Sequence, residues 1–159
     1  MLRNMTAVYI TDRDRMLLLY RVGSRVVPPS WCGIGGHFEP EEWNDPRRCV
    51  LRELYEETGI KENDIANLRL KYITFRLKNN EIRQNYYFFA EWSRRELALK
   101  PCGEGTLEWV EIRNLAGLEM PHGAKHCLEH YLRTGIRDDD VYCGSAVADG
   151  VVWTALKEF

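Results

Sequence analysis

The sequence lacks long hydrophobic runs, a surplus of charge of either sign, and closely spaced cysteine pairs. Within residues 1–20 the apolar runs are only four or five residues long, and a charged stretch at residues 12–15 interrupts them. Signal peptides and membrane-spanning helices need much longer apolar segments. We therefore expect a protein that is neither exported nor inserted into a membrane.

The charge balance is close to neutral. The chain has 22 Lys and Arg residues against 24 Asp and Glu residues, which gives a formal net charge of -2. Such a balance provides no general polycation for binding a nucleic acid polymer or an anionic membrane surface. A phosphate-bearing ligand would have to be bound by a local site.

The cysteines are odd in number and contain no C-x-x-C pair. This usage predicts neither a zinc ribbon nor a disulfide framework, and we expect reduced thiols in a cytoplasmic protein. The five positions are Cys32, Cys49, Cys102, Cys127 and Cys143.

The chain also shows no internal repeat, low-complexity tract or long linker. Its 159 residues, 45% of them hydrophobic, have the length of one typical domain. At that size about 70% of the unfolded surface can be buried. We therefore predict a single domain over residues 1–159.

Hydrophobic periodicity predicts an α/β fold with a mixed sheet and helices on its faces. A helix over residues 45–58 is marked at both ends, with Asp45 as the N-cap, Pro46 at the first helical position and Gly59 just past the end. A second helix is expected at residues 121–134. Strands are expected at residues 5–11, 16–22, 31–35, 67–77, 82–92 and 107–112, with a final hairpin over 141–156 that turns at Asp149-Gly150.

Residues 36–60 carry seven carboxylates against three arginines. Helical geometry predicts a packing side and, opposite to it, an acidic side. The packing side would hold Leu51, Leu54, Tyr55 and Thr58, and the acidic side Glu53, Glu56 and Glu57. Carboxylates four residues apart repel each other, and anions in a last helical turn oppose the helix dipole, so a cation should compensate. Mg²⁺ or Mn²⁺ takes such ligands, and the alternative is salt bridges through Arg48 and Arg52.

The same segment resembles a known family. Gly36, Glu42 and the run R-E-L-Y-E-E-T-G-I at residues 52–60 look like the Nudix box, G-x5-E-x7-R-E-U-x-E-E-x-G-U, and the second half matches at every specified position. Nine residues separate Glu42 from Arg52 where the pattern has seven, which leaves the position of Glu42 open. The chain has Ile34 before Gly35-Gly36, where the MutT-like branch of the family often has proline.

The resemblance implies the α/β/α Nudix sandwich and a Mg²⁺-dependent hydrolase, with Mn²⁺ as a substitute, acting on phosphoric anhydride bonds. It also implies which residues act. The metal ligands would be Glu53, Glu56, Glu57 and the carbonyl of Gly35, with Arg52 orienting the glutamates. Two candidates for the general base are Glu53 and Glu104, the latter in the glycine-flanked loop Gly103-Glu104-Gly105. An ordinary solvated loop acid is the alternative for Glu104.

Substrate contacts are expected from the sheet face and nearby loops. Strand alternation puts Asn85 on the same face as Tyr87 and Phe89, so it is a candidate for binding a nucleobase, although core packing also explains the aromatic residues. Arg21 and Arg25 are candidate phosphate contacts.

His37 follows the double glycine and would either approach the phosphates or make a local hydrogen bond. His122, His126 and His130 share one face of the second helix. They would form either a soft-metal site or a solvated surface.

Three functions follow from the resemblance. The first is MutT-like hydrolysis of nucleoside triphosphates, oxidised ones such as 8-oxo-dGTP included, to the monophosphate and pyrophosphate. The second is hydrolysis of ADP-ribose or another nucleotide conjugate, which a tight homodimer on a sizing column would favour over a monomer. The third is a noncatalytic ligand-sensing domain, which an intact set of box glutamates argues against.

Overall fold

The computed structural model describes residues 1–22, 28–94 and 103–157. Within them the strands are β1 (Leu2–Asp12), β2 (Arg15–Arg21), β3 (Ser30–Cys32), β4 (Ile65–Lys78), β5 (Glu81–Trp92), β6 (Gly105–Glu111), β7 (Val141–Val147) and β8 (Gly150–Leu156). The α-helices are α1 (Pro46–Thr58) and α2 (His122–Arg133). The short 3-10 helices are η1 (Pro40–Glu42), η2 (Glu62–Asp64), η3 (Ile112–Gly117) and η4 (Gly135–Arg137).

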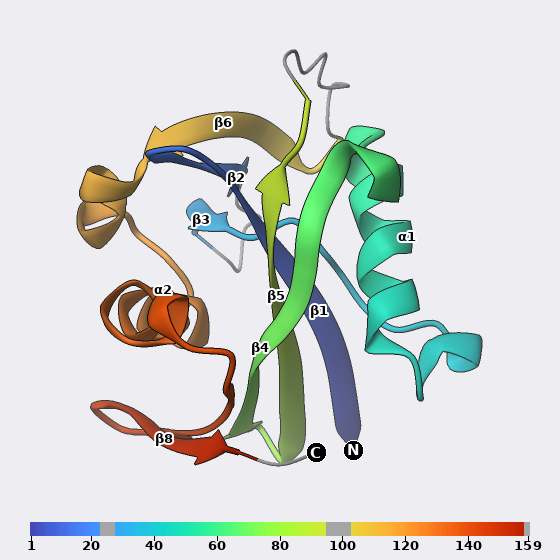
Figure 1. Ribbon diagram of the computed structural model, residues 1–159. Coiled ribbons are helices and arrows are strands. Elements are labelled where there is room, and N and C mark those ends of the chain that lie inside the picture. Colours follow the sequence, from blue (N-terminus) through green and yellow to red (C-terminus); the bar gives the residue numbers. More distant parts are fainter. Residues whose placement is uncertain (23–27, 95–102, 158–159) are drawn as a thin grey trace.

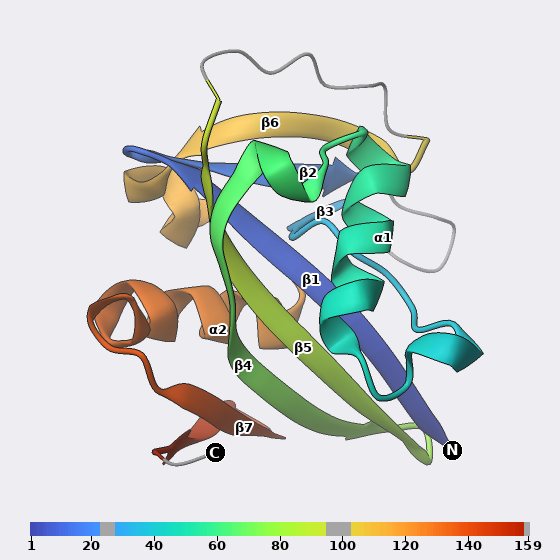
Figure 2. The same cartoon turned by 45° about the vertical axis from the view of Figure 1, so that its right-hand side comes forward.

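The strands form one mixed sheet, as predicted. Its order is β3-β2-β1-β5-β4-β7-β8, and β6 pairs with β2. The pairs β1/β5 and β4/β7 are parallel, and the other pairs are antiparallel. Figure 1 shows α1 and α2 on opposite sides of this sheet, and Figure 2 shows β1, β5 and β4 running side by side between them.

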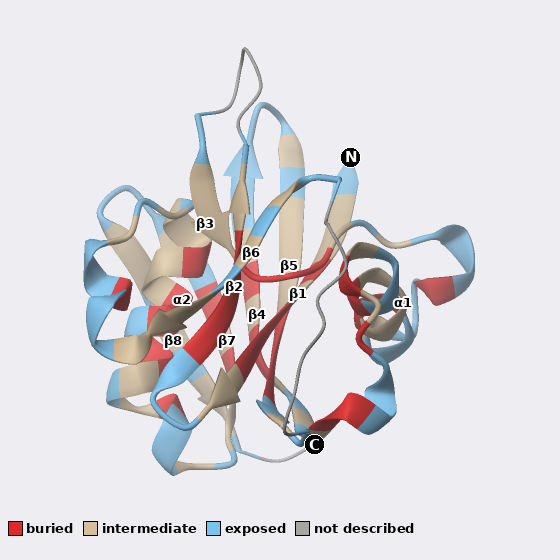
Figure 3. Ribbon diagram, turned by 90° about the horizontal axis from the view of Figure 1, so that it is seen from above, coloured by how far each residue is buried: buried red, intermediate tan, exposed pale blue. Residues whose placement is uncertain are grey.

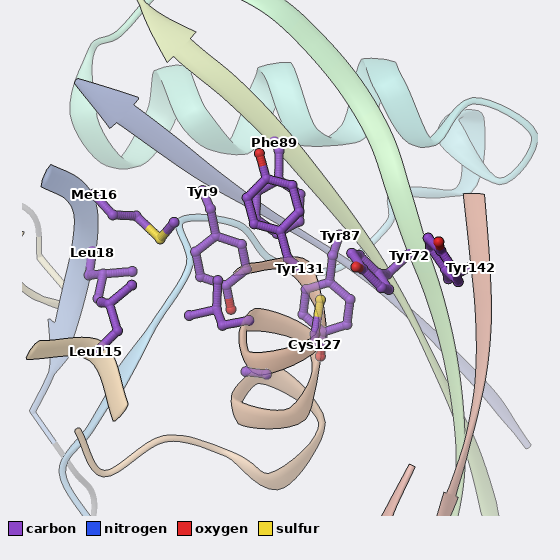
Figure 4. Packing of buried hydrophobic residues seen from close by; sticks show 12 residues of the cluster. Tyr9, Met16, Leu18, Tyr72, Tyr87, Phe89, Leu115, Cys127, Tyr131 and Tyr142 are labelled. Atoms are coloured by element: carbon purple, nitrogen blue, oxygen red, sulfur yellow. The ribbon is translucent and has the colours of Figure 1, made fainter. Parts of the chain in front are cut away.

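Strand alternation divides the core into two layers. Val8 and Ile10 of β1 face the cluster beneath α1, whereas Tyr9 faces the cluster beneath α2. Figure 3 shows the buried strand segments between the two helices, and Figure 4 shows aromatic side chains filling the space between the sheet and α2. The predicted alternation in β5 is confirmed, since Tyr87 and Phe89 lie in the α2 layer and Phe88 in the α1 layer.

The predicted end signals of the first helix are confirmed. The Asp45 side chain accepts a hydrogen bond from the backbone N–H of Arg48 at 3.0 Å. Gly59 has a left-handed φ of 76° and donates its N–H to the carbonyl of Tyr55 at 2.8 Å. Helix α1 has 13 residues and α2 has 12. Within the described ranges no helix is long and apolar enough to cross a membrane.

The last hairpin differs from its prediction by one residue. Val147 pairs with Gly150, so Ala148 and Asp149 form the two-residue turn. Gly150 has a φ of 157°, and it begins β8 instead of completing the turn.

The strand predicted over residues 31–35 is shorter in the structure than predicted, because the chain leaves β2 after Cys32 and bridges to β1 at Ile34.

Candidate active site

The acidic residues of α1 lie in a seam between the helix and the glycine loop, which we define as residues 33–37. The exposed fraction of the side chain is 9% for Glu57, 14% for Glu53 and 55% for Glu56. The expectation that all three point away from the packed side is therefore wrong for Glu53 and Glu57. Tyr55, expected to pack, is 47% exposed. The residues of α1 that are buried are Cys49, Val50, Leu54 and Thr58.

Hydrogen bonds to β1 hold the glycine loop against these carboxylates. The backbone N–H of Thr6 donates to the carbonyl of Gly36 at 2.9 Å. The N–H of Gly35 donates to Oε2 of Glu57 at 3.2 Å. Gly35 has a φ of 152°, a conformation that residues with a side chain rarely adopt. A methyl group at Gly36 would lie 2.6 Å from the Glu53 carboxylate, whereas one at Gly35 would collide with the Thr6 carbonyl of β1. Gly36 thus allows the backbone to approach Glu53, and Gly35 allows the loop to lie against β1.

We expect Gly36→Ala to displace Glu53 and to lower kcat by about a hundredfold, the scale of a 1 Å misplacement in an active site. The close contact is with a side chain that can rotate, so the fold should persist. Steady-state hydrolysis kinetics and a melting curve would check both parts. Gly117→Ala is the matched control, because a methyl group there would meet nothing within 4 Å. Equal activity of the two variants would contradict a role for Glu53.

Arg52 connects the buried and exposed acids. Its Nε and Nη2 donate to Oε1 and Oε2 of Glu42 at 2.8 and 2.9 Å. Its Nη1 lies 3.0 Å from Oε1 of Glu53 and donates to Oε2 of Glu56 at 2.9 Å. The hydrogen bonds from Arg52 lower the pKa of Glu42 to about 2. The position of Glu42 is thereby fixed, because η1 returns the chain to Arg52 despite the two additional residues.

Arg21 and Glu104 complete the acidic site from the opposite side. Nη2 of Arg21 lies 2.5 Å from Oε2 of Glu104 and 3.9 Å from Oε1 of Glu57. Burial, and secondly the charge of Glu104, raises the pKa of Glu57 to about 7, although Arg21 opposes the shift. Burial also raises the pKa of Glu53. Arg21 and Glu104 help to line a shallow surface depression of about 470 Å³.

The donor chemistry of this seam fits a hard divalent cation. Glu53 and Glu57 are largely withdrawn from water, and burial raises the pKa of both. Burial therefore disfavours the charged form of each carboxylate, and a bound cation would stabilise that form. The Glu56 carboxylate is bound by Arg52 and does not join Glu53 and Glu57 as a third metal ligand in this arrangement. In the described part of the chain, no three His, Cys, Asp or Glu side chains are close enough together to hold an ion. A side-chain rotation of Glu56 or backbone oxygens would have to complete the ligand set.

Among the described residues most predicted site residues come together, but Asn85 does not. Gly35, Arg52, Glu53, Glu57, Arg21 and Glu104 surround the seam, with Glu56 on its rim. Asn85 lies on the α2 face of β5, where it pairs with Met5 of β1 and Thr74 of β4. Arg25 lies outside the described residues.

The histidines have local partners. His37 accepts a hydrogen bond at Nε2 from Nε of Arg3 at 2.5 Å, and burial followed by the charges of Arg3 and Arg21 lowers its pKa. The His122 and His126 rings are 4.5 Å apart. His130 is buried and bonded to the Tyr72 hydroxyl at 2.9 Å, so it belongs neither to a solvated face nor to a three-histidine metal site.

Comparisons with known proteins agree with the fold and the motif. Residues 1–131 match the family model described as NUDIX domain. The chain is 30% identical over 132 residues to the NAD-capped RNA hydrolase NudC of Chromobacterium violaceum, covering 81% of the chain and 46% of that protein. It is 28% identical over 141 residues to the Nudix hydrolase YvcI of Bacillus subtilis, covering 83% and 80%. The crystal structure of the MutT protein from Bacillus halodurans superposes with a TM-score of 0.68 and 26% identity over 99% of each chain.

Proposed function

The chain belongs to the NUDIX domain family, and from that premise we propose that it is a Mg²⁺-dependent pyrophosphohydrolase of nucleoside triphosphates. The products would be the nucleoside monophosphate and pyrophosphate, and oxidised nucleotides such as 8-oxo-dGTP are among the expected substrates. The observation that carries the proposal is the seam in which Glu53 and Glu57, both largely buried, converge on the glycine loop. Two ionised carboxylates so placed are unfavourable unless a cation is bound.

Different residues of the chain would bind the metal ion and the substrate phosphates. Glu53, Glu56, Glu57 and the Gly35 carbonyl would hold the ion, while Arg52 keeps Glu53 and Glu56 within one network. When bound, a divalent ion neutralises phosphate oxygens and acidifies a water molecule. Arg21 would bind a phosphate of the substrate through its guanidinium, and its position between Glu57 and Glu104 allows it to exchange a carboxylate for that phosphate. Phosphoryl transfer depends mainly on such positioning and charge stabilisation.

Glu104 is our candidate for the residue that accepts the proton of the attacking water, with Glu53 as the alternative. Its carboxylate is 54% exposed and reaches the site from the loop before β6. We expect Glu104→Gln to lower kcat by about a hundredfold with little change in KM, since general bases contribute about 10² to 10⁴ in rate. Initial-rate measurements would check this. An unchanged kcat would exclude Glu104 and leave Glu53.

A second candidate function is hydrolysis of a nucleotide conjugate. The relative NudC is named for hydrolysis of NAD-capped RNA, and the chain spans about half of its length. The MutT structure, in contrast, is matched over 99% of its length. A monomer or a homodimer is compatible with the triphosphate reaction, whereas a tight homodimer would favour the conjugate reaction.

Product analysis distinguishes these functions. Purified protein with Mg²⁺ would be incubated with canonical and oxidised nucleoside triphosphates, ADP-ribose, NAD and dinucleoside polyphosphates, and the products resolved by ion-exchange chromatography. Monophosphate plus pyrophosphate from a triphosphate supports our proposal. Preferential cleavage of ADP-ribose or NAD would assign the conjugate reaction, and no turnover with Mg²⁺ or Mn²⁺ would indicate a ligand-sensing domain.

A further inference from the structure

Three arginines occupy neighbouring register positions on three adjacent strands at one end of the sheet. Arg83 of β5 is in register with Arg3 of β1 on one side and with Arg76 of β4 on the other. We call these residues the arginine row. Adjacent strands lie about 4.8 Å apart, so the row spans about 10 Å. In Figures 1 and 2 the start of β1 and the turn between β4 and β5 lie at the same end of the molecule.

The arginine row lies on the α2 side of the sheet. Side chains an even number of residues apart in a strand share a face. The residues four positions away from Arg3, Arg83 and Arg76 are Ala7, Tyr87 and Tyr72, respectively. Tyr72 and Tyr87 belong to the core cluster beneath α2, and Ala7 packs against it. Asn85 is two residues from Arg83 and shares this face. The predicted substrate face therefore includes the row.

The charges of the row are poorly balanced. Nε of Arg83 donates to Oε2 of Glu81 at 3.0 Å, whereas Arg3 donates to a histidine. Arg76 is exposed and makes no hydrogen bond or ion pair with the residues described here. Like charges at directly opposed positions destabilise a sheet. Three guanidinium groups with one carboxylate therefore form a site that an anion would stabilise.

The row begins at the end of the glycine loop, which borders the acidic seam. Arg3 contacts His37, which follows Gly36, and the His37 carbonyl accepts from Nη2 of Arg52 at 3.0 Å. At the other end, Arg76 is among the charges that lower the pKa of His122, after burial and His126. His122 opens α2, whose first turn has no acidic residue. The row thus extends from the end of the glycine loop towards the positive end of a helix.

We propose that the arginine row binds a phosphate group which the substrate carries beyond the anhydride bond that is cleaved. This inference rests on the proposed function, because it takes the acidic seam as the place of cleavage. Guanidinium groups bind phosphate through paired hydrogen bonds and remain charged at any physiological pH. The phosphate would come either from the polyphosphate tail of a nucleotide or from a phosphate on the second half of a nucleotide conjugate.

A binding experiment tests the row without catalysis. Inorganic tripolyphosphate would be titrated into the metal-free protein and followed by calorimetry and by melting temperature. We expect Arg76→Gln and Arg83→Gln each to weaken binding about tenfold, and Arg76→Gln to raise the melting temperature of the ligand-free protein by removing repulsion. Arg113→Gln is the matched control, since Arg113 is 80% exposed and pairs with Glu111 away from the row. Equal affinity of all four proteins would overturn the proposal.

Paired substrates identify the source of the phosphate. Nucleoside triphosphate would be compared with diphosphate, and NADP with NAD, in the wild-type protein and in Arg83→Gln. If Arg83→Gln loses an approximately tenfold preference of the wild type for triphosphate over diphosphate, the phosphate belongs to a polyphosphate tail. If it loses such a preference for NADP over NAD, the phosphate belongs to the second half of a conjugate. Hydrolysis with no dependence on Arg83 in either pair overturns the inference but leaves the proposed function. Tripolyphosphate binding that depends on the row, without hydrolysis of any substrate, supports the anion site and contradicts the proposed function.

Discussion

Glu57→Gln is expected to abolish most metal-dependent turnover, lowering kcat by at least about a hundredfold, and at the same time to stabilise the metal-free protein. The first effect follows because the buried carboxylate is lost as a ligand and as a source of charge stabilisation. Hydrolysis rates across a Mg²⁺ titration measure it. A variant with unchanged kcat would remove the proposed metal site.

The second effect follows from the raised pKa of Glu57. Burial raises this pKa from 4.5 in the unfolded chain to about 7 in the folded protein. The folded state therefore binds the proton more tightly, and the free energy of unfolding falls as the pH rises from about 4.5 to about 7. Above that range the deficit is at most about 3 kcal/mol. Glutamine removes it, so melting of the metal-free variant should occur about 5 °C higher at pH 8.

Mg²⁺ should reverse this order of stability. A ligand that binds only the folded state raises the melting temperature, and we expect this increase in the wild-type protein but not in Glu57→Gln. Glu129→Gln is the control, because Glu129 is a partly exposed helical glutamate of α2 outside the site. If both substitutions change the metal-free melting temperature equally, burial of the charged Glu57 carboxylate does not destabilise the folded protein.

Local signals were sufficient to predict the helix that carries the site. Asp45 and Gly59 act through hydrogen bonds within a few residues of themselves, so the sequence alone determines where α1 begins and ends. Strand alternation likewise predicted which residues of β5 face each helix. Both signals depend on periodicity and caps, which are properties of short segments.

The burial of Glu53 and Glu57 could not be predicted in the same way. It depends on the glycine loop, which contacts Glu57 across 22 positions of the chain, and on Arg21, which meets Glu104 across 83 positions. Helical periodicity describes the faces of an isolated helix but not which loop will cover them. The arginine row depends on the parallel pairing of β1 with β5, another contact between distant segments. The seam and the row were therefore visible only in the fold.

Glu42→Gln should lower the stability of the folded protein by about 3 kcal/mol at pH 7 and lose that effect in acid. Hydrogen bonds from Arg52 lower the pKa of Glu42 from 4.5 to about 2 in the folded protein. The charged carboxylate therefore contributes its full stability above pH 4.5, and the contribution disappears as the pH falls towards about 2. Chemical denaturation at pH 7, 4 and 2.5 would measure the difference between wild type and variant.

The control for this experiment is Glu39→Gln. Glu39 also approaches Arg52, at 4.0 Å, but its side chain is 58% exposed whereas that of Glu42 is 2% exposed. Exposed ion pairs contribute about 0–1 kcal/mol, so Glu39→Gln should change stability little at any pH. Glu42→Gln should in addition lower kcat about tenfold, because Arg52 loses its bidentate anchor and no longer holds Glu53 and Glu56 in place. A stability loss that is the same at pH 7 and pH 2.5 would mean that Glu42 acts through its shape and not through its charge.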